Sequence, residues 1–87
     1  MFAAQSLQVL LEGKGIIMSL AMVALGEVKE IQELRGKDDV KRRLQDLGFV
    51  KGEMVKVVGE SQGGIIIIVK GVKIALNKGL ASLITVA

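Results

Sequence analysis

The stretch that decides how this chain folds is RLQDLGFVKG, residues 43–52. Leu44 and Leu47 lie three positions apart, as they would on one face of a helix. Gly48 follows where a helix needs a left-handed C′ residue, and Phe49, at C″, is placed to fold back on Leu44 as in a Schellman motif. The stretch therefore predicts the end of a helix, its stop signal and the turn that follows.

The helix that ends at this stop is predicted to begin at Asp38, whose carboxylate is suited to cap the N-terminus. Val40 extends the apolar stripe by one turn, whereas Lys41 and Arg42 point away from the stripe. A narrow stripe of this kind predicts a helix that rests on a core and keeps a charged outer side.

Strands are predicted beyond Gly52, the glycine that bounds the turn. Met54–Val58 is rich in β-forming residues, and Gly59 after it is predicted to end the strand. Residues 62–64 (QGG) form a predicted loop. This half of the chain therefore predicts sheet rather than helix.

The apolar run Ile65–Val69 is the strongest strand signal. Lys70-Gly71 supplies a two-residue turn, and Val72–Leu76 returns as the second arm of a hairpin. A strand that is apolar at every position must be covered on both faces. Closure into a small barrel provides this cover, with the helix at one end and residues 83–86 closing the sheet.

The pattern between Leu20 and Leu34 is ambiguous. Its apolar residues fall on three- and four-residue spacings, which favours a helix. Gly26 could instead split the segment into a helical turn and a strand that begins near Glu27. Periodicity alone predicts the helix.

Residues 1–17 are predicted to be a leader or N-terminal extension, helical or disordered, and residues 18–87 the folded domain. Residues 12–15 (EGKG) must be encoded by purine-rich codons shortly before Met18, which resembles a ribosome-binding site, so Met18 is the predicted native start. The longest apolar run, residues 16–25, is about half the length needed to cross a bilayer. No transmembrane segment is therefore predicted.

The chain contains no histidine and no cysteine. It thus lacks the commonest general base, the commonest transition-metal ligand and every thiolate. The pair Asp38-Asp39 lacks the ladder of oxygen ligands of a calcium loop. No P-loop motif is present, and Ser61, Ser82 and Thr85 have no histidine partner. The composition predicts a protein that is not an enzyme and that holds no cofactor and no metal.

The net charge is +3, and the basic residues are interspersed with acids. Only Phe2 and Phe49 are aromatic, so the stacking platform of a single-strand binder is missing. No nucleic-acid partner is expected, and a nucleic-acid-binding small barrel stays as a further alternative. The basic excess favours an acidic protein surface as partner.

Two motifs carry a family resemblance. Residues 43–52 meet the pattern Arg-Leu-x-x-Leu-Gly-Phe-x-x-Gly in full, and Ile74–Leu76 is followed by Ala81 and by residues 84–86 (ITV). With these motifs in this order, residues 18–87 resemble the bacterial ferrous-iron transport protein A (FeoA) family. Two stretches depart from the family pattern. Asn77 stands where the family often has arginine, and the loop at 62–64 replaces one that often contains proline.

The resemblance implies a mainly β fold, a small SH3-like barrel of about five strands with one short capping helix and an extra helical turn. Residues 20–27 resemble the opening of the family, a short helical turn followed by Gly-Glu. The resemblance also implies a strand at Val28–Leu34, against the periodicity, and we follow it there.

The resemblance implies a non-catalytic accessory protein of ferrous-iron uptake. Its partner would be the FeoB transporter, a membrane protein with a G-protein domain, whose cytosolic part it would bind and modulate. The expected location is the cytoplasm, at the inner face of the membrane. The alternative is a transition-metal-binding or metal-sensing regulatory domain, because the same module resembles the C-terminal domain of some metal-dependent repressors. An open strand edge also makes a homodimer an expectation.

The partner surface is expected on the outer side of the helix and on the turn after it. The predicted partner-binding residues are Lys41, Arg42, Arg43, Val50 and Lys51. The predicted structural residues are Asp38, Leu44, Leu47, Gly48, Phe49, Gly52 and Gly71.

Overall fold

The computed structural model describes residues 17–87. The elements are β1 (Met18–Ser19), the 3-10 helix η1 (Leu20–Met22), β2 (Val28–Leu34), α2 (Asp38–Asp46), β3 (Met54–Ser61), β4 (Gly64–Val69), β5 (Val72–Asn77), α3 (Lys78–Ala81) and β6 (Ile84–Val86). The predicted leader falls, apart from Ile17, outside the described residues. In the part of the chain that is described, no helix has the length and hydrophobicity needed to cross a membrane.

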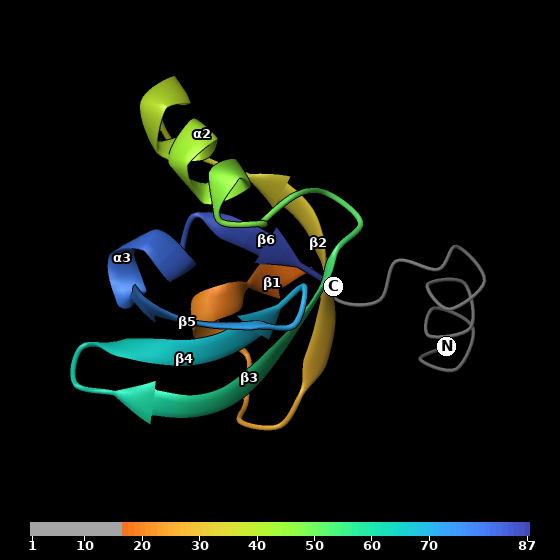
Figure 1. Ribbon diagram of the computed structural model, residues 1–87, viewed down its shortest axis with the longest axis vertical. Helices are drawn as coiled ribbons and strands as arrows, with labels where there is room; N and C mark the ends of the chain where they lie inside the picture. The colour runs from red at the N-terminus through yellow and green to blue at the C-terminus, as the bar shows by residue number, and fades with distance from the viewer. Residues whose placement is uncertain (1–16) are drawn as a thin grey trace, which may run out of the picture.

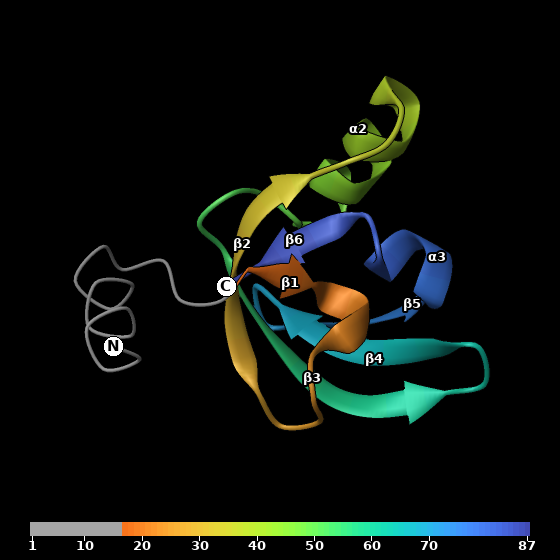
Figure 2. The same ribbon diagram turned by 180° about the vertical axis from the view of Figure 1, so that it is seen from behind.

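The strands of this part form one sheet in the order β1-β6-β2-β3-β4-β5, and each neighbouring pair is antiparallel. The sheet curls around a single core, with η1 behind it and α2 at one end (Figures 1 and 2). This confirms the predicted mainly β barrel with a short capping helix and an extra helical turn. The strand at Val28–Leu34 is also confirmed, whereas the helix that periodicity favoured there is wrong.

Branched aliphatic side chains and one aromatic ring fill the core. Phe49, Leu20, Ile31, Leu44, Ile67 and Ile84 are the largest of the fully buried side chains. They come from η1, from α2 and its stop, and from three different strands. The core is therefore built from segments that lie far apart in the sequence. Burial of such side chains is the main free-energy gain for a domain of this size.

The stop of α2 is the predicted Schellman motif. Gly48 has a φ of 110°, and its amide donates to the carbonyl oxygen of Gln45 at 2.9 Å. The amide of Phe49 donates to the carbonyl oxygen of Leu44 at 3.0 Å, and both of these side chains are fully buried. These are the two hydrogen bonds and the hydrophobic contact that define the motif. The helix end therefore fixes Phe49 in the core.

Two predictions about α2 are wrong. Asp38 is the first residue of the helix rather than its cap, since Lys37 holds the N-cap position and makes no side-chain capping bond. Leu47 was expected in the core but is 43% exposed. Leu44 of the helix is fully buried and Val40 packs against the core, while Phe49, just past the C-cap, takes the buried position at this end of the barrel and leaves Leu47 partly exposed.

The β4–β5 hairpin confirms the two-residue turn. Val69 pairs with Val72, and Lys70 and Gly71 have φ values of 52° and 76°, as a type I′ turn requires. A Cβ on Gly48 would meet the side-chain carbons of Lys70 from 3.6 Å, so the lysine stem lies beside the helix stop. The hairpin tip and the end of α2 thus brace each other.

The β3–β4 connection is tighter than predicted. Strand β3 does not end at Gly59 but runs on to Ser61, past a register shift between Val57 and Gly59. Ser61 pairs with Gly64, so the turn consists of two residues, and Gly64 is the first residue of β4 rather than part of the loop. The bulge bends β3 and lets it follow the curvature of the barrel.

Candidate partner-binding surface

The predicted partner surface lies on α2 and the turn after it, at the end of the barrel. Arg42 and Arg43 are exposed, and Lys41 is half-buried. Leu44 is buried in the core and Val40 packs against it, whereas the side of α2 that carries Arg42 and Arg43 is open to a neighbouring molecule.

The turn that carries Val50 and Lys51 is held by backbone hydrogen bonds. The amide of Glu53 donates to the carbonyl oxygen of Val50 at 3.1 Å, which closes a β-turn with Gly52 at a φ of 91°. The amide of Gly52 donates to the carbonyl oxygen of Ile31 at 2.8 Å, and the amide of Ile31 donates to the carbonyl oxygen of Glu53 at 2.8 Å. The turn is therefore fastened to β2, and Lys51 projects from a fixed backbone.

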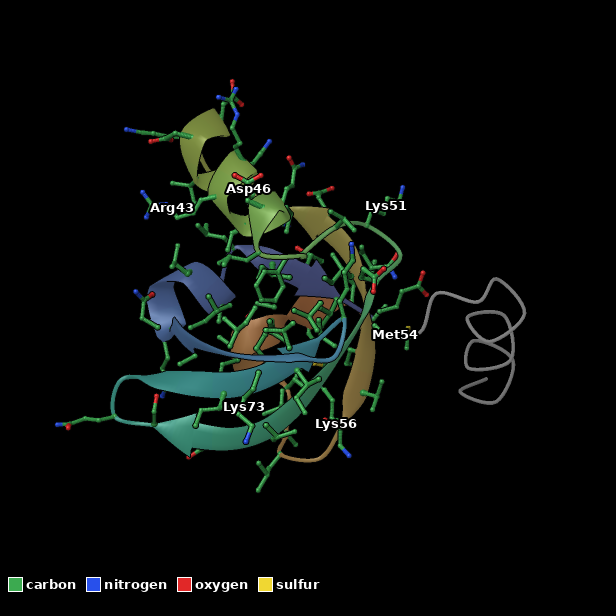
Figure 3. All side chains as sticks on the ribbon, viewed as in Figure 1. Arg43, Asp46, Lys51, Met54, Lys56 and Lys73 are labelled. Carbon is green, nitrogen blue, oxygen red and sulfur yellow. The ribbon has the colours of Figure 1, made fainter. Side chains whose placement is uncertain are left out.

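The five predicted residues do not form one flat patch. Successive residues of a helix are rotated by about 100°, so Lys41, Arg42 and Arg43 point in three directions. Figure 3 shows Arg43 and Lys51 on opposite sides of the end of α2, with Asp46 between them. A flat partner would contact Arg43 or Lys51 but not both, whereas a concave partner that surrounds α2 would contact all three basic residues of the helix.

The basic residues of this surface form no ion pair within the described residues. Within residues 17–87 the ion pairs are Lys29 with Glu27, at 3.9 Å, and Arg35 with Glu33, at 3.8 Å. Neither pair involves α2 or its turn. The surface therefore offers basic side chains that are free to pair with a partner, while Asp38, Asp39 and Asp46 of the same helix balance its formal charge.

The described residues place no cluster of metal-binding side chains on this surface. Within residues 17–87 there is no group of three or more carboxylate, imidazole or thiolate side chains close enough to share a metal ion. No enclosed pocket is found in this part of the chain. The basic side chains of α2 and its turn can form ion pairs and hydrogen bonds with another surface.

Sequence reasoning missed a second exposed surface, on the outside of the sheet. The run Ile65–Val69 was expected to be covered on both faces, yet Ile66 and Ile68 are only half-buried while Ile65, Ile67 and Val69 are buried. The Lys70-Gly71 turn could have indicated this exposure, because a two-residue turn fixes the register of the hairpin and so the side chains that lie opposite Ile66 and Ile68.

Comparisons with known proteins agree with this fold. A family model described as the FeoA domain matches residues 18–87. A crystal structure of an iron uptake regulatory protein (FeoA) is 30% identical, with a TM-score of 0.76, and the match covers 83% of this chain and 96% of that one. The FeoA protein of Chlorobium tepidum is 31% identical, with a TM-score of 0.72 and coverage of 79% and 68%.

Two further likenesses bear on the fold. The FeoA of Stenotrophomonas maltophilia, solved with zinc and described as a prokaryotic SH3 domain protein, is 30% identical over 80% of this chain and 89% of that one, with a TM-score of 0.69. A manganese-dependent transcriptional repressor is 15% identical with a TM-score of 0.75, which shows a shared SH3-like fold and nothing more. Among curated proteins, no sequence matches this chain.

Proposed function

Because the chain belongs to the FeoA family, we propose that it is a non-catalytic accessory protein of bacterial ferrous-iron uptake. In this proposal it binds the cytosolic part of a FeoB-like transporter and modulates that transporter. The match over residues 18–87 supports the link to ferrous-iron transport, and the partner follows from the resemblance. Its place would be the cytoplasm, at the inner face of the membrane.

The observation that carries the proposal is a run of basic side chains on the outer part of α2 that form no ion pair within the described residues. Lys41, Arg42 and Arg43 follow one another on α2, and none of them is ion-paired within residues 17–87. Free positive charge of this kind attracts an acidic surface and fixes the orientation in which it docks. The partner surface is therefore expected to be acidic and to receive α2 in a concavity.

The double variant Lys41→Glu/Arg42→Glu tests this docking surface. It reverses two charges on the outer side of α2 and leaves the buried Leu44 untouched. We expect binding to the cytosolic region of the transporter to weaken about tenfold or more, since like charges would then face each other across the interface. A pull-down of that region with wild-type and variant protein, at equal concentrations, measures the effect.

Arg35→Glu/Lys78→Glu is the matched control. It makes the same change in net charge at two exposed positions outside the proposed surface, so binding should stay close to that of the wild type. Equal recovery of the transporter region by all three proteins would refute α2 as the docking element. Equal loss in both variants would show an effect of net charge alone and would also refute it.

A further inference from the structure

The outer face of the sheet carries an ordered row of side chains across four strands. Val28 lies opposite Lys56, Lys56 opposite Ile68, and Ile68 opposite Lys73. Residues directly opposite in an antiparallel sheet share a face, and their strand neighbours Val55, Ile67 and Val69 are buried in the core on the other face. The row therefore points to solvent, with one half-buried isoleucine between two exposed lysines.

A second row lies beside the first. Gly59 and Ala75 flank Ile66, so the isoleucine has a small residue on either side. A Cβ on Gly59 would meet the side chain of Ile66 at 3.6 Å, which shows that Ile66 leans over the glycine. Ile66 and Ile68 thus form a low apolar ridge along β4, and both side chains are half-buried.

The lysines beside this ridge carry uncompensated charge. Lys56 and Lys73 form no ion pair within the described residues, and Figure 3 shows both of them projecting from the outer side of the sheet. The strand register places the carboxylate of Glu30 on this face, opposite Met54 and at the end of the strands that is away from Ile66. The ridge is therefore apolar in its centre and positive on both flanks.

The spacing of the two lysines matches one kind of occupant. They lie two strands apart, which is about 10 Å at the usual spacing between strands. An α-helix with its side chains is about 10–12 Å wide. A helix laid along β4 would place its apolar stripe on Ile66 and Ile68 and its two flanks beside Lys56 and Lys73.

We propose that this outer face of β3, β4 and β5 binds an acidic amphipathic helix of a partner protein. The helix lies along β4, with its apolar stripe on the ridge and glutamates or aspartates on both flanks paired with the two lysines. The site is separate from α2, so this proposal can fail without affecting the proposed transporter interface, and the reverse is also true. A membrane is a poorer match, because two lysines attract an anionic leaflet only weakly, and Ile66 and Ile68 between them are half-buried.

The probe is the two-heptad peptide Ac-ELAALEAELAALEA-NH2, which places a leucine stripe between two rows of glutamate. The control peptide Ac-KLAALKAKLAALKA-NH2 keeps the stripe and reverses every charge. In an NMR titration of the full chain labelled with 15N, the acidic peptide should bind at least tenfold more tightly than the basic one. The amides of Ile66, Ile68, Lys73 and Ala75 should shift most, while those of α2 should not move.

Lys56→Glu/Lys73→Glu provides the charge-swap test. This variant should lose the acidic peptide and gain the basic one, because the flanks of the ridge then carry negative charge. Arg35→Glu/Lys78→Glu should bind both peptides as the wild type does. A dispersed 15N spectrum of the first variant excludes unfolding as the cause of a reversed preference, and the second variant, which has the same net charge, excludes net charge as the cause.

Several results would overturn the proposal. They are equal binding of both peptides, no binding at millimolar peptide, or shifts centred on α2. Ridge amides that shift with protein concentration alone would assign the face to a second copy of the chain and refute the helix. Binding to vesicles of phosphatidylserine and phosphatidylcholine that Lys56→Glu/Lys73→Glu abolishes, without binding of the acidic peptide, would assign it to a membrane and refute the helix equally.

Discussion

Replacing Phe49 with alanine is expected to lower the free energy of unfolding by about 3–5 kcal/mol, the usual cost of removing a buried aromatic side chain. Phe49 is fully buried, and its backbone is fixed by the hydrogen bond to Leu44, so the neighbours have little freedom to collapse into the space. Typical domains are stable by only about 5–15 kcal/mol. The variant should therefore be close to unfolding at room temperature.

Urea unfolding followed by far-ultraviolet circular dichroism measures this loss. Val72→Ala is the control, because Val72 is 55% exposed at the hairpin turn and its truncation should cost less than about 1 kcal/mol. If Phe49→Ala cost no more than Val72→Ala, the ring would not close the barrel as described.

Gly64→Ala is expected to be the most damaging change that adds a single carbon. A Cβ at this position would overlap the backbone carbonyl oxygen of Leu76 and come within 3.0 Å of the Cα of Asn77. Backbone atoms cannot rotate away as a side chain does, so β4 and β5 must separate where they meet α3. We expect a loss of about 3 kcal/mol or more, at the upper end of the range for overpacking.

Gly59→Ala supplies the matched comparison for this prediction. Gly59 also lies in a strand, but a Cβ there meets only the side chain of Ile66, at an ordinary van der Waals distance of 3.6 Å. The free energy of unfolding should change by less than about 1 kcal/mol, measured by the same urea titration. Equal losses in the two variants would contradict the close approach of β5 to Gly64.

The sequence predicted those parts of the fold that local chemistry determines. The stop of α2 could be predicted from Leu44, Gly48 and Phe49, because a left-handed residue with an apolar residue after it and another at C3 is the local signature of a Schellman motif. The Lys70-Gly71 turn was equally local. The strand β2 was different, since its apolar spacing matched a helix and only the family resemblance corrected it.

The exposed positions depended on geometry that no local pattern contains. The spacing of Val40, Leu44 and Leu47 places all three on one stripe, but it does not say how much of the stripe the barrel covers. Leu47, at the C-cap between buried Leu44 and buried Phe49, is left 43% exposed. Likewise, a run of five apolar residues does not show that one of its faces is left half-open. That result follows from the register that pairs Ile68 with Lys56 and Lys73.

The candidate surfaces differ in the same way. Lys41, Arg42, Arg43, Val50 and Lys51 were chosen because they adjoin one another in sequence. The structure keeps them at one end of the barrel but turns Arg43 and Lys51 to opposite sides of α2 (Figure 3). Their closeness in sequence thus predicted that they lie at the same end of the barrel. The directions of the side chains depend on the rotation of the helix from one residue to the next.

The central claim is that this chain acts by binding a partner protein and needs no bound metal to do so. Isothermal titration of the cytosolic region of a FeoB-like transporter into the full chain, in buffer with a metal chelator, tests it most directly. We predict saturable binding at a fixed stoichiometry, weakened by added salt because charged side chains carry it. Absence of binding under these conditions, with binding restored by ferrous iron, would contradict the claim.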